Sequence, residues 1–220
     1  VFTMKKLTAL FLAIAGAMLF LLAGCANNDD FTEKKYQSGD DPVEQIVIEV
    51  TDRALEFSVS EDDRVHIDYF DSDKEYLDID LSDNRLTVRL EFDKDWTDFI
   101  GIKPSETYRK IQVRVPSDMI TDLTASTTNE NITVTSLSFA GSVTLDSNGG
   151  NILCERVGVG KAIGLTAKNG NISGTILGEW DDFSISCTIK KGECNLTDKE
   201  GGVKSLTADC NNGNINIAFV

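Results

Sequence analysis

The sequence predicts an all-β protein whose second half is a short solenoid of stacked β-coils, preceded by an acidic, strand-rich part. Three observations support this fold class. One short pattern returns five times between Leu123 and Val220, with apolar residues at matching positions. Strand-like alternation of apolar and polar residues runs through the preceding part. No long window outside residues 7–22 has the apolar spacing of an amphipathic helix.

The returning unit is a strand, a polar turn built on Asn and Gly, and a second strand. The first apolar residue after each turn gives five anchor positions, at steps of 20, 20, 22 and 21 residues: Ile132, Ile152, Ile172, Cys194 and Ile215. A near-constant step of this size is typical of a solenoid, because each repeat buries its apolar face only by stacking on its neighbours. We therefore expect about five coils of 20–22 residues over residues 121–220.

Two further sets of apolar residues align across the repeats. Nine residues before the anchors stand Leu123, Val143, Ile163, Ile185 and Leu206, and seven before stand Ala125, Leu145, Leu165, Cys187 and Ala208. The interval of two residues places both sets on one face of a strand. The position between them is hydroxylic in four of the five repeats and is expected to face water. Ordinary antiparallel hairpins with Asn-Gly turns are the alternative, but they predict no such alignment.

The turns repeat an asparagine, at Asn131, Asn151, Asn171 and Asn214. We interpret these residues as structural, because Asn and Gly accept left-handed backbone angles and stacked Asn side chains can hydrogen-bond from coil to coil. The alternative is that they contact a ligand. The fourth repeat has Glu193-Cys194 where the others have Asn-Ile, which predicts a weak point in the asparagine series.

The first 24 residues predict a signal peptide of the lipoprotein type. Two lysines precede an apolar run over residues 7–22, and Leu22-Ala23-Gly24-Cys25 resembles the lipobox of bacterial lipoproteins. That resemblance implies cleavage before Cys25 and acylation of its sulfur, with the exported protein anchored in lipid on the outer face of a bacterial membrane. A transmembrane helix is the alternative, but a span needs roughly 20 apolar residues. Residues 25–42 are polar and acidic and predict a flexible tether.

The acidic part, residues 43–120, reads as six alternating segments separated by acidic turns. The segments centre on Ile48, Phe57, Ile67, Ile79, Val88 and Val113. This part forms either a small sandwich or irregular coils that continue the stack, and in both cases it covers one open end of the solenoid. The segment 93–102 interrupts the alternation. Its Trp96 and Phe99 form a binding loop or fold onto the sheet.

Charge and cysteine placement exclude several classes of function. The net charge of −15 disfavours nucleic acid and anionic lipid headgroups as partners.

Besides Cys25, the cysteines lie on inward strand faces, where free thiols act as small apolar fillers; they are Cys154, Cys187, Cys194 and Cys210. One disulfide between neighbouring coils is the alternative. A zinc site would need close C-x-x-C pairs, which the sequence lacks, and we expect no metal and no cofactor.

No set of residues predicts catalysis. His66 is the only histidine and lies in a strand pattern, so no Ser-His-Asp arrangement can be proposed. Pairs of carboxylates such as Asp78 and Asp80 lack the turn glycine of a calcium loop. Asp181 and Asp182 are the nearest approach to the paired acids of a glycosidase, and we interpret them as a solvated turn. We therefore predict a protein that is not an enzyme.

The repeats, together with the strand that precedes them, resemble a bacterial family of putative adhesins of unknown function. The matching segments are Val113–Pro116, Asn129–Ile132, Asn148–Ile152, Asn169–Ile172 and Asn212–Ile215, and the resemblance covers residues 43–220. It implies a short right-handed β-helix on the cell envelope. We expect a lipoprotein held in the membrane through acylated Cys25, whose scaffold binds a protein or glycan. The alternatives are an accessory of an envelope-stress or regulatory system that contacts membrane proteins of its own cell, and a polysaccharide-acting enzyme.

Overall fold

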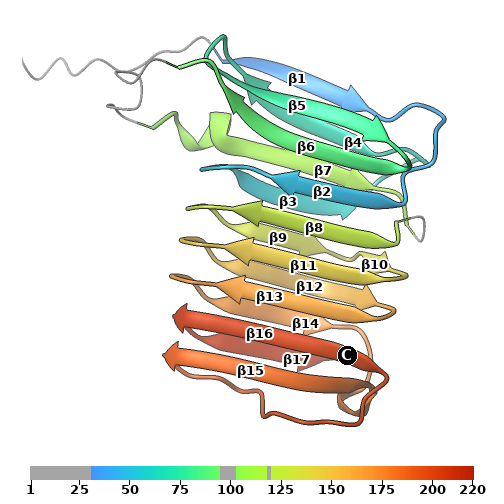
Figure 1. The fold of residues 1–220 in the computed structure, drawn as a ribbon, viewed down its shortest axis with the longest axis vertical. Coiled ribbons are helices and arrows are strands. Elements are labelled where there is room, and N and C mark those ends of the chain that lie inside the picture. The colour runs from blue at the N-terminus through green and yellow to red at the C-terminus, as the bar shows by residue number, and fades with distance from the viewer. Residues whose placement is uncertain (1–30, 95–102, 118–119) are drawn as a thin grey trace, which may run out of the picture.

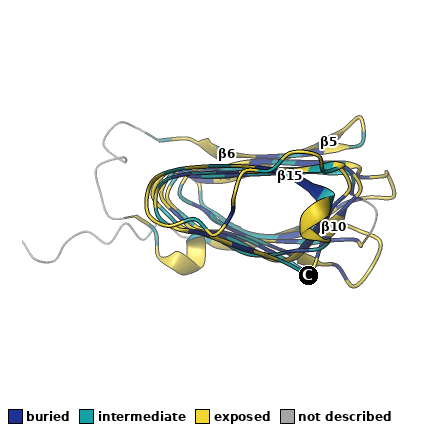
Figure 2. Cartoon of the chain, turned by 90° about the horizontal axis from the view of Figure 1, so that it is seen from below, coloured by how far each residue is buried: buried dark blue, intermediate teal, exposed yellow. Residues whose placement is uncertain are grey.

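The computed structural model describes residues 31–94, 103–117 and 120–220. Within these ranges the chain forms strands, two short 3-10 helices and no α-helix. Two sheets face each other and make a flattened stack of coils (Figures 1 and 2). The all-β, solenoid-like fold expected from the sequence is thus confirmed. The signal peptide, Cys25 with its lipobox, Trp96 and Phe99 lie outside the described residues.

We call the two layers the front sheet and the back sheet, as they lie in Figure 1. The front sheet contains, from the upper end, β5 (Glu75–Ser82), β6 (Arg85–Phe92), β2 (Gln45–Glu49), β8 (Asp122–Thr127), β11 (Ser142–Ser147), β13 (Ala162–Ala167), β16 (Lys204–Asn212) and β15 (Phe183–Lys191). The back sheet contains β1 (Thr32–Gln37), β4 (His66–Asp71), β7 (Lys110–Val115), β3 (Ala54–Val59), β9 (Ile132–Thr135), β12 (Ile152–Val159), β14 (Ile172–Ile176) and β17 (Ile215–Phe219), with β10 (Ser138–Phe139) beside β12. The 3-10 helices are η2 (Glu106–Arg109) and η3 (Trp180–Asp182).

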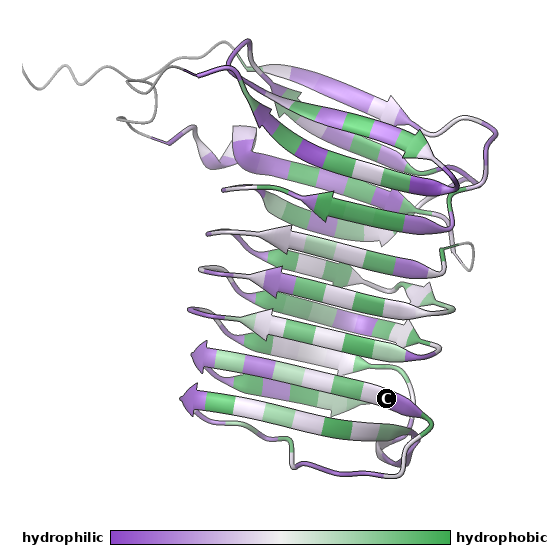
Figure 3. Cartoon of the chain, in the orientation of Figure 1, coloured by the Kyte–Doolittle hydropathy of each residue, from purple (hydrophilic) through white to green (hydrophobic). Residues whose placement is uncertain are grey.

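Each coil consists of a front strand, a turn and a back strand, and successive coils pair in parallel. Val143 aligns with Leu123 on one side and Ile163 on the other, and Ile152 aligns with both Ile132 and Ile172. These side chains are at most 1% exposed and fill the space between the sheets. Hydropathy alternates along the strands accordingly (Figure 3). The predicted ladders are therefore the core of the protein, and burial of each such residue contributes about 1.5–3 kcal/mol.

The last two coils are stacked in an order that differs from the sequence. The coil of β16 and β17 lies between the β13–β14 coil and the coil that begins with β15, because β16 pairs with both β13 and β15. Ile215 correspondingly aligns with Ile172 and forms a bridge with Cys194. The repeat that lacks the asparagine thus becomes the terminal coil. The expected weak point in the asparagine series falls at the end of the stack and leaves the series unbroken.

The acidic part continues the same two sheets. β2 pairs with β8 in the front sheet and β3 pairs with β9 in the back sheet, both in parallel, and the β6–β7 coil lies outside them. Of the two arrangements that the sequence left open, the structure has the coils that continue the stack. The predicted boundary near residue 121 is crossed by strand pairing in both sheets.

Antiparallel strands and one connecting segment cover the two ends of the stack. At the upper end β5 pairs with β6, while β4 pairs with β7 and β1 pairs with β4. At the lower end the Ile185 amide donates to the Lys199 carbonyl at 2.7 Å, and the Lys199 amide donates to the Ile185 carbonyl at 2.9 Å. The antiparallel pairing at the upper end and the Ile185–Lys199 hydrogen bonds at the lower end satisfy backbone groups that would otherwise be unpaired at the edges of the coils.

One expectation for the amino-terminal side is wrong. Residues 32–37, predicted as part of a flexible tether, form β1 and align with six residues of β4. The reason lies in contacts distant in sequence, because Tyr36 packs against the core and the Ser38 amide donates to the Val65 carbonyl at 2.9 Å. Backbone pairing thus orders a segment that has little apolar content.

No helix in the described part of the chain is long and apolar enough to cross a membrane.

Candidate ligand-binding site

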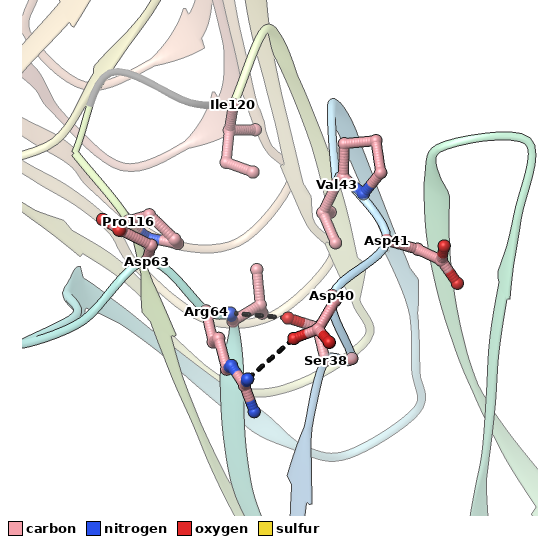
Figure 4. Close-up of a pocket in the computed structure, with 11 residues that line it drawn as sticks. Ser38, Asp40, Asp41, Val43, Asp63, Arg64, Pro116 and Ile120 are labelled. Atoms are coloured by element: carbon pink, nitrogen blue, oxygen red, sulfur yellow. Dashed lines mark hydrogen bonds and ion pairs between the residues drawn. The ribbon is translucent and has the colours of Figure 1, made fainter.

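A pocket of about 380 Å³ lies at one edge of the upper coils, where three connections meet (Figure 4). The connections are β1–β2, β3–β4 and β7–β8. They converge because β1, β3 and β7 end at this edge, and the strands that follow them, β2, β4 and β8, begin there. Residues distant in sequence, such as Asp40, Asp63 and Pro116, therefore line one hollow.

The floor of the pocket is apolar and fixed by the core. Val43, Val65 and Ile120 line it and are 6%, 1% and 2% exposed, and Pro116 is also buried. Ser38 ties two of the connections together, because its hydroxyl accepts from the Val65 amide at 3.0 Å. The floor is thus part of the packed interior, and a ligand meets a surface that is already in place.

The rim of the pocket is charged and mostly acidic. Asp40, Asp41 and Asp63 line it beside a single cation, Arg64, whose Nη2 donates to Asp40 Oδ1 at 2.8 Å. The Asp40 side chain is 94% exposed and Arg64 is 44% exposed, so water screens this ion pair and it is weak. An entering group can therefore displace Arg64 from Asp40 at little cost.

A second set of contacts shapes the β3–β4 turn just behind the rim. Asp62 Oδ1 lies 2.7 Å from His66 Nε2 and accepts from the Arg64 amide at 3.0 Å. The hydrogen bond from His66, followed by those from the Arg64 amide and Ser60, holds the pKa of Asp62 below its usual value. The only histidine of the chain is therefore engaged in a turn and does not lie among the pocket residues.

This arrangement suits binding better than chemistry. Three carboxylates against one guanidinium favour a ligand with a cationic group or several hydrogen-bond donors, and the floor accepts an apolar portion. The pocket residues include no nucleophile paired with a base, which covalent catalysis needs. Among the residues that the structure describes, no three His, Cys, Asp or Glu side chains lie close enough together to hold a metal ion.

The asparagines of the turns form a continuous chain of hydrogen bonds on the opposite edge of the coils. Each side-chain Oδ1 accepts from the backbone amide of the next coil: Asn131 from Asn151, Asn151 from Asn171 and Asn171 from Asn214 at 2.8 Å, and Asn214 from Glu193 at 2.9 Å. None of the four asparagines has a positive φ, so the left-handed backbone invoked from the sequence is not their role. They link successive turns instead.

The remaining residues considered from the sequence lie apart from the pocket. Asp181 Oδ1 pairs with Lys199 Nζ at 3.0 Å, and Asp182 accepts from the Glu179 amide at 3.0 Å in the η3 turn. The four described thiols are free: Cys154 and Cys210 are buried, and Cys187 and Cys194 are partly exposed. Burial, and then a hydrogen bond with Cys194, raise the pKa of the Cys187 thiol to about 12.

The fold defines a class of protein, an all-β domain with a solenoid-like stack of coils. Residues 43–219 match the family described as Toastrack DUF4097, and the chain belongs to that family. The resemblance to putative adhesins drawn from the sequence is thereby confirmed. No curated protein matches this sequence.

Solved structures that are similar to this chain come from several bacteria. A putative cell adhesion protein from Clostridium sporogenes ATCC 15579 is similar with a TM-score of 0.51 and 11% identity, covering 86% of this chain and 100% of that one. A putative adhesin from Parabacteroides merdae ATCC 43184 has a TM-score of 0.32 and 17% identity, over 88% and 97% of the two chains. A putative lipid binding protein from Parabacteroides distasonis ATCC 8503 has a TM-score of 0.29 and 12% identity, over 90% and 98%. At 11% identity, the first likeness shows the fold.

Proposed function

We propose that this protein is an exported, lipid-anchored binding scaffold without catalytic activity, which holds a protein or glycan partner at the pocket of the upper coils. The observation that carries the proposal is the composition of the pocket, an apolar floor set in the core beneath an acidic rim, without a nucleophile and base. The similar protein from Clostridium sporogenes is described as a putative cell adhesion protein, which agrees with such a role. Cys25, in its lipobox, supplies the anchor.

The proposal is tested by binding of the purified full-length protein to an array of glycans and to intact bacterial cells. We expect Asp41→Asn with Asp63→Asn to weaken binding of the partner by roughly tenfold, because two of the three rim carboxylates are removed. Asp146→Asn, a carboxylate on the outer face of β11, is the matched control and is expected to bind as the wild type does. Equal binding by all three proteins contradicts a role for the pocket.

Catalysis and anchoring are tested separately. Hydrolysis or elimination of a glycan by the purified protein, abolished by substitution of one acid, would refute the non-catalytic assignment.

Cys25→Ser is expected to lose labelling by radioactive fatty acid and to release the protein from membranes. Detergent-dependent membrane association that survives Cys25→Ser would refute the lipid anchor.

Cross-linking on intact cells separates adhesion from a role inside the producing envelope. A photoreactive residue at position 41, on the pocket rim, is expected to form adducts with added host material or foreign cells if the protein is an adhesin. Adducts with membrane proteins of the same cell would instead support the accessory of an envelope-stress or regulatory system.

A further inference from the structure

The point where the chain enters the solenoid limits how the protein can sit on a membrane. β1 begins at Thr32, and only six residues, 26–31, separate it from Cys25. Fully extended, these residues reach about 20–22 Å. The front sheet has eight strands, and its seven spacings of about 4.8 Å make the stack roughly 34 Å long. The upper end is therefore tied close to the anchor, while the lower end can stand well away from it.

Aromatic side chains gather at the corner of the upper end where the chain enters. Phe31 stacks on Tyr108 of η2, with ring centres 5.1 Å apart and planes at 13°, and Tyr108 meets Phe70 of β4 edge-on at 5.4 Å. Tyr76 and Phe92, near the adjoining ends of β5 and β6, are 43% and 40% exposed, and Tyr108 is 37% exposed.

Strand pairing shows that these residues share one edge. Thr32 aligns with Asp71 at the end of β4, and Glu75 aligns with Phe92 at the end of β6, with only a short turn between Asp71 and Glu75. The same edge holds the start of β7, which η2 precedes (Figure 1). Phe31, Tyr76, Phe92 and Tyr108 thus lie along one edge of the upper coils, beside the entry of the chain and opposite the pocket, and we call this set the collar.

The chemistry of the collar fits the headgroup region of a bilayer. Tyrosine concentrates at membrane–water interfaces, because its ring buries apolar surface while its hydroxyl keeps contact with water, and the two phenylalanines add apolar surface beside Tyr76 and Tyr108. Lys94 Nζ lies 5.2 Å from the centre of the Phe92 ring and pairs with Glu75, so this cation is engaged within the protein and the chemistry of the collar is that of its aromatic rings.

We propose that the collar of Phe31, Tyr76, Phe92 and Tyr108 rests on the lipid bilayer and holds the solenoid upright, with its lower end pointing away from the membrane. The inference rests on the lipid anchor of the proposed function and adds a contact and an orientation to it. The lower end has exposed apolar groups of its own, Trp180 at 37% and Val203 at 89%. In an upright solenoid these groups lie roughly 34 Å further out and face partners in the surroundings.

The test uses quenching of tryptophan fluorescence by lipids that carry bromine on their acyl chains, with the full-length acylated protein in phosphatidylcholine vesicles. Both reporter proteins carry Trp96→Phe. The lower reporter keeps native Trp180, and the upper reporter has Tyr108→Trp with Trp180→Phe. Phe92→Trp serves as a second upper reporter in case the first does not fold, and circular dichroism checks each variant.

We expect brominated lipid to quench the upper reporter strongly and to leave the lower reporter unchanged. Equal quenching of both reporters would show a solenoid lying flat and overturn the proposal, as would quenching of Trp180 alone or of neither reporter in protein that floats with the vesicles. If the protein does not float with the vesicles and its mass shows an unmodified Cys25, the lipid anchor is refuted, and the proposed orientation, which depends on the anchor, is refuted with it. Flotation and mass thus separate failure of the anchor from failure of the collar.

Discussion

Gly170→Ala is expected to destabilise the protein strongly, because this residue lies against the backbone of the preceding coil. A Cβ at position 170 would stand 2.1 Å from the Gly150 carbonyl oxygen and 2.6 Å from its carbon. These atoms belong to the backbone of a paired coil, so the coils must separate by about 1 Å locally. Overpacking of this kind costs about 1–3 kcal/mol, and backbone contact places Gly170 at the upper limit. For a domain of this size, 3 kcal/mol lowers the Tm by roughly 6–12 °C.

Gly164→Ala in the same coil is the matched control. Its nearest neighbour is Thr144 Oγ1 at 4.0 Å from the added Cβ, on the outer face of β13. We expect no loss of stability, and a gain of up to about 1 kcal/mol because alanine restricts the unfolded chain. The assay is thermal and urea unfolding followed by circular dichroism. Gly170→Ala unfolding at the wild-type temperature, or both variants shifting equally, would contradict steric contact between coils as the reason for glycine in these turns.

Three further predictions concern charge, hydrogen bonding and thiol reactivity. Burial works to raise the pKa of Glu75, but hydrogen bonds and charge from Lys94 and Arg53 outweigh burial, and the pKa is lowered. The ionised Glu75 therefore stabilises the folded protein above the ordinary glutamate pKa of about 4.3. This stabilisation is lost as the pH falls through the pKa that Glu75 has in the folded protein. Glu75→Gln should lower the free energy of unfolding by about 3–5 kcal/mol near pH 7 and reduce the loss of stability on the acid side of a plot of unfolding free energy against pH. An unchanged acid side of that plot would contradict the role of the ion pairs of Glu75 with Arg53 and Lys94. Asn171→Ala should cost about 0.5–1.5 kcal/mol in urea unfolding because the Asn214 amide loses its acceptor, whereas Asn171→Asp, which keeps an oxygen, should cost less. Burial raises the pKa of Cys154 to about 12, so mass spectrometry should find this thiol unalkylated by iodoacetamide in the folded protein and alkylated in urea; rapid labelling of the folded protein would show an open coil.

The repeat predicted the core because the same physical requirement acts in every coil. A residue such as Val143 must be apolar to meet Leu123 and Ile163, so the step length and the inward positions are visible in the sequence. The order of the coils is not visible in this way. Ile215 and Cys194 both fit the ladder position next to Ile172, and the spacing of the repeats does not distinguish them.

The first strand and the pocket could not be predicted for related reasons. β1 has a single large apolar residue, Tyr36, and is held by pairing with β4, so its order depends on a strand that follows it in sequence. Asp40 and Asp63 each belong to ordinary polar turns. They form one rim only because strands of both sheets end or begin at the same edge of the coils.

The inverted order of the last two coils makes the order of synthesis matter. β15 leaves the ribosome before β16, and until β16 exists the free edge of β13 is the surface that β15 itself could occupy. In the native stack Asn171 Oδ1 accepts from the Asn214 amide, and Asn214 Oδ1 in turn accepts from the Glu193 amide. β16 and β17 thus intervene between two coils that precede them in sequence, and the β15 coil becomes the end of the stack.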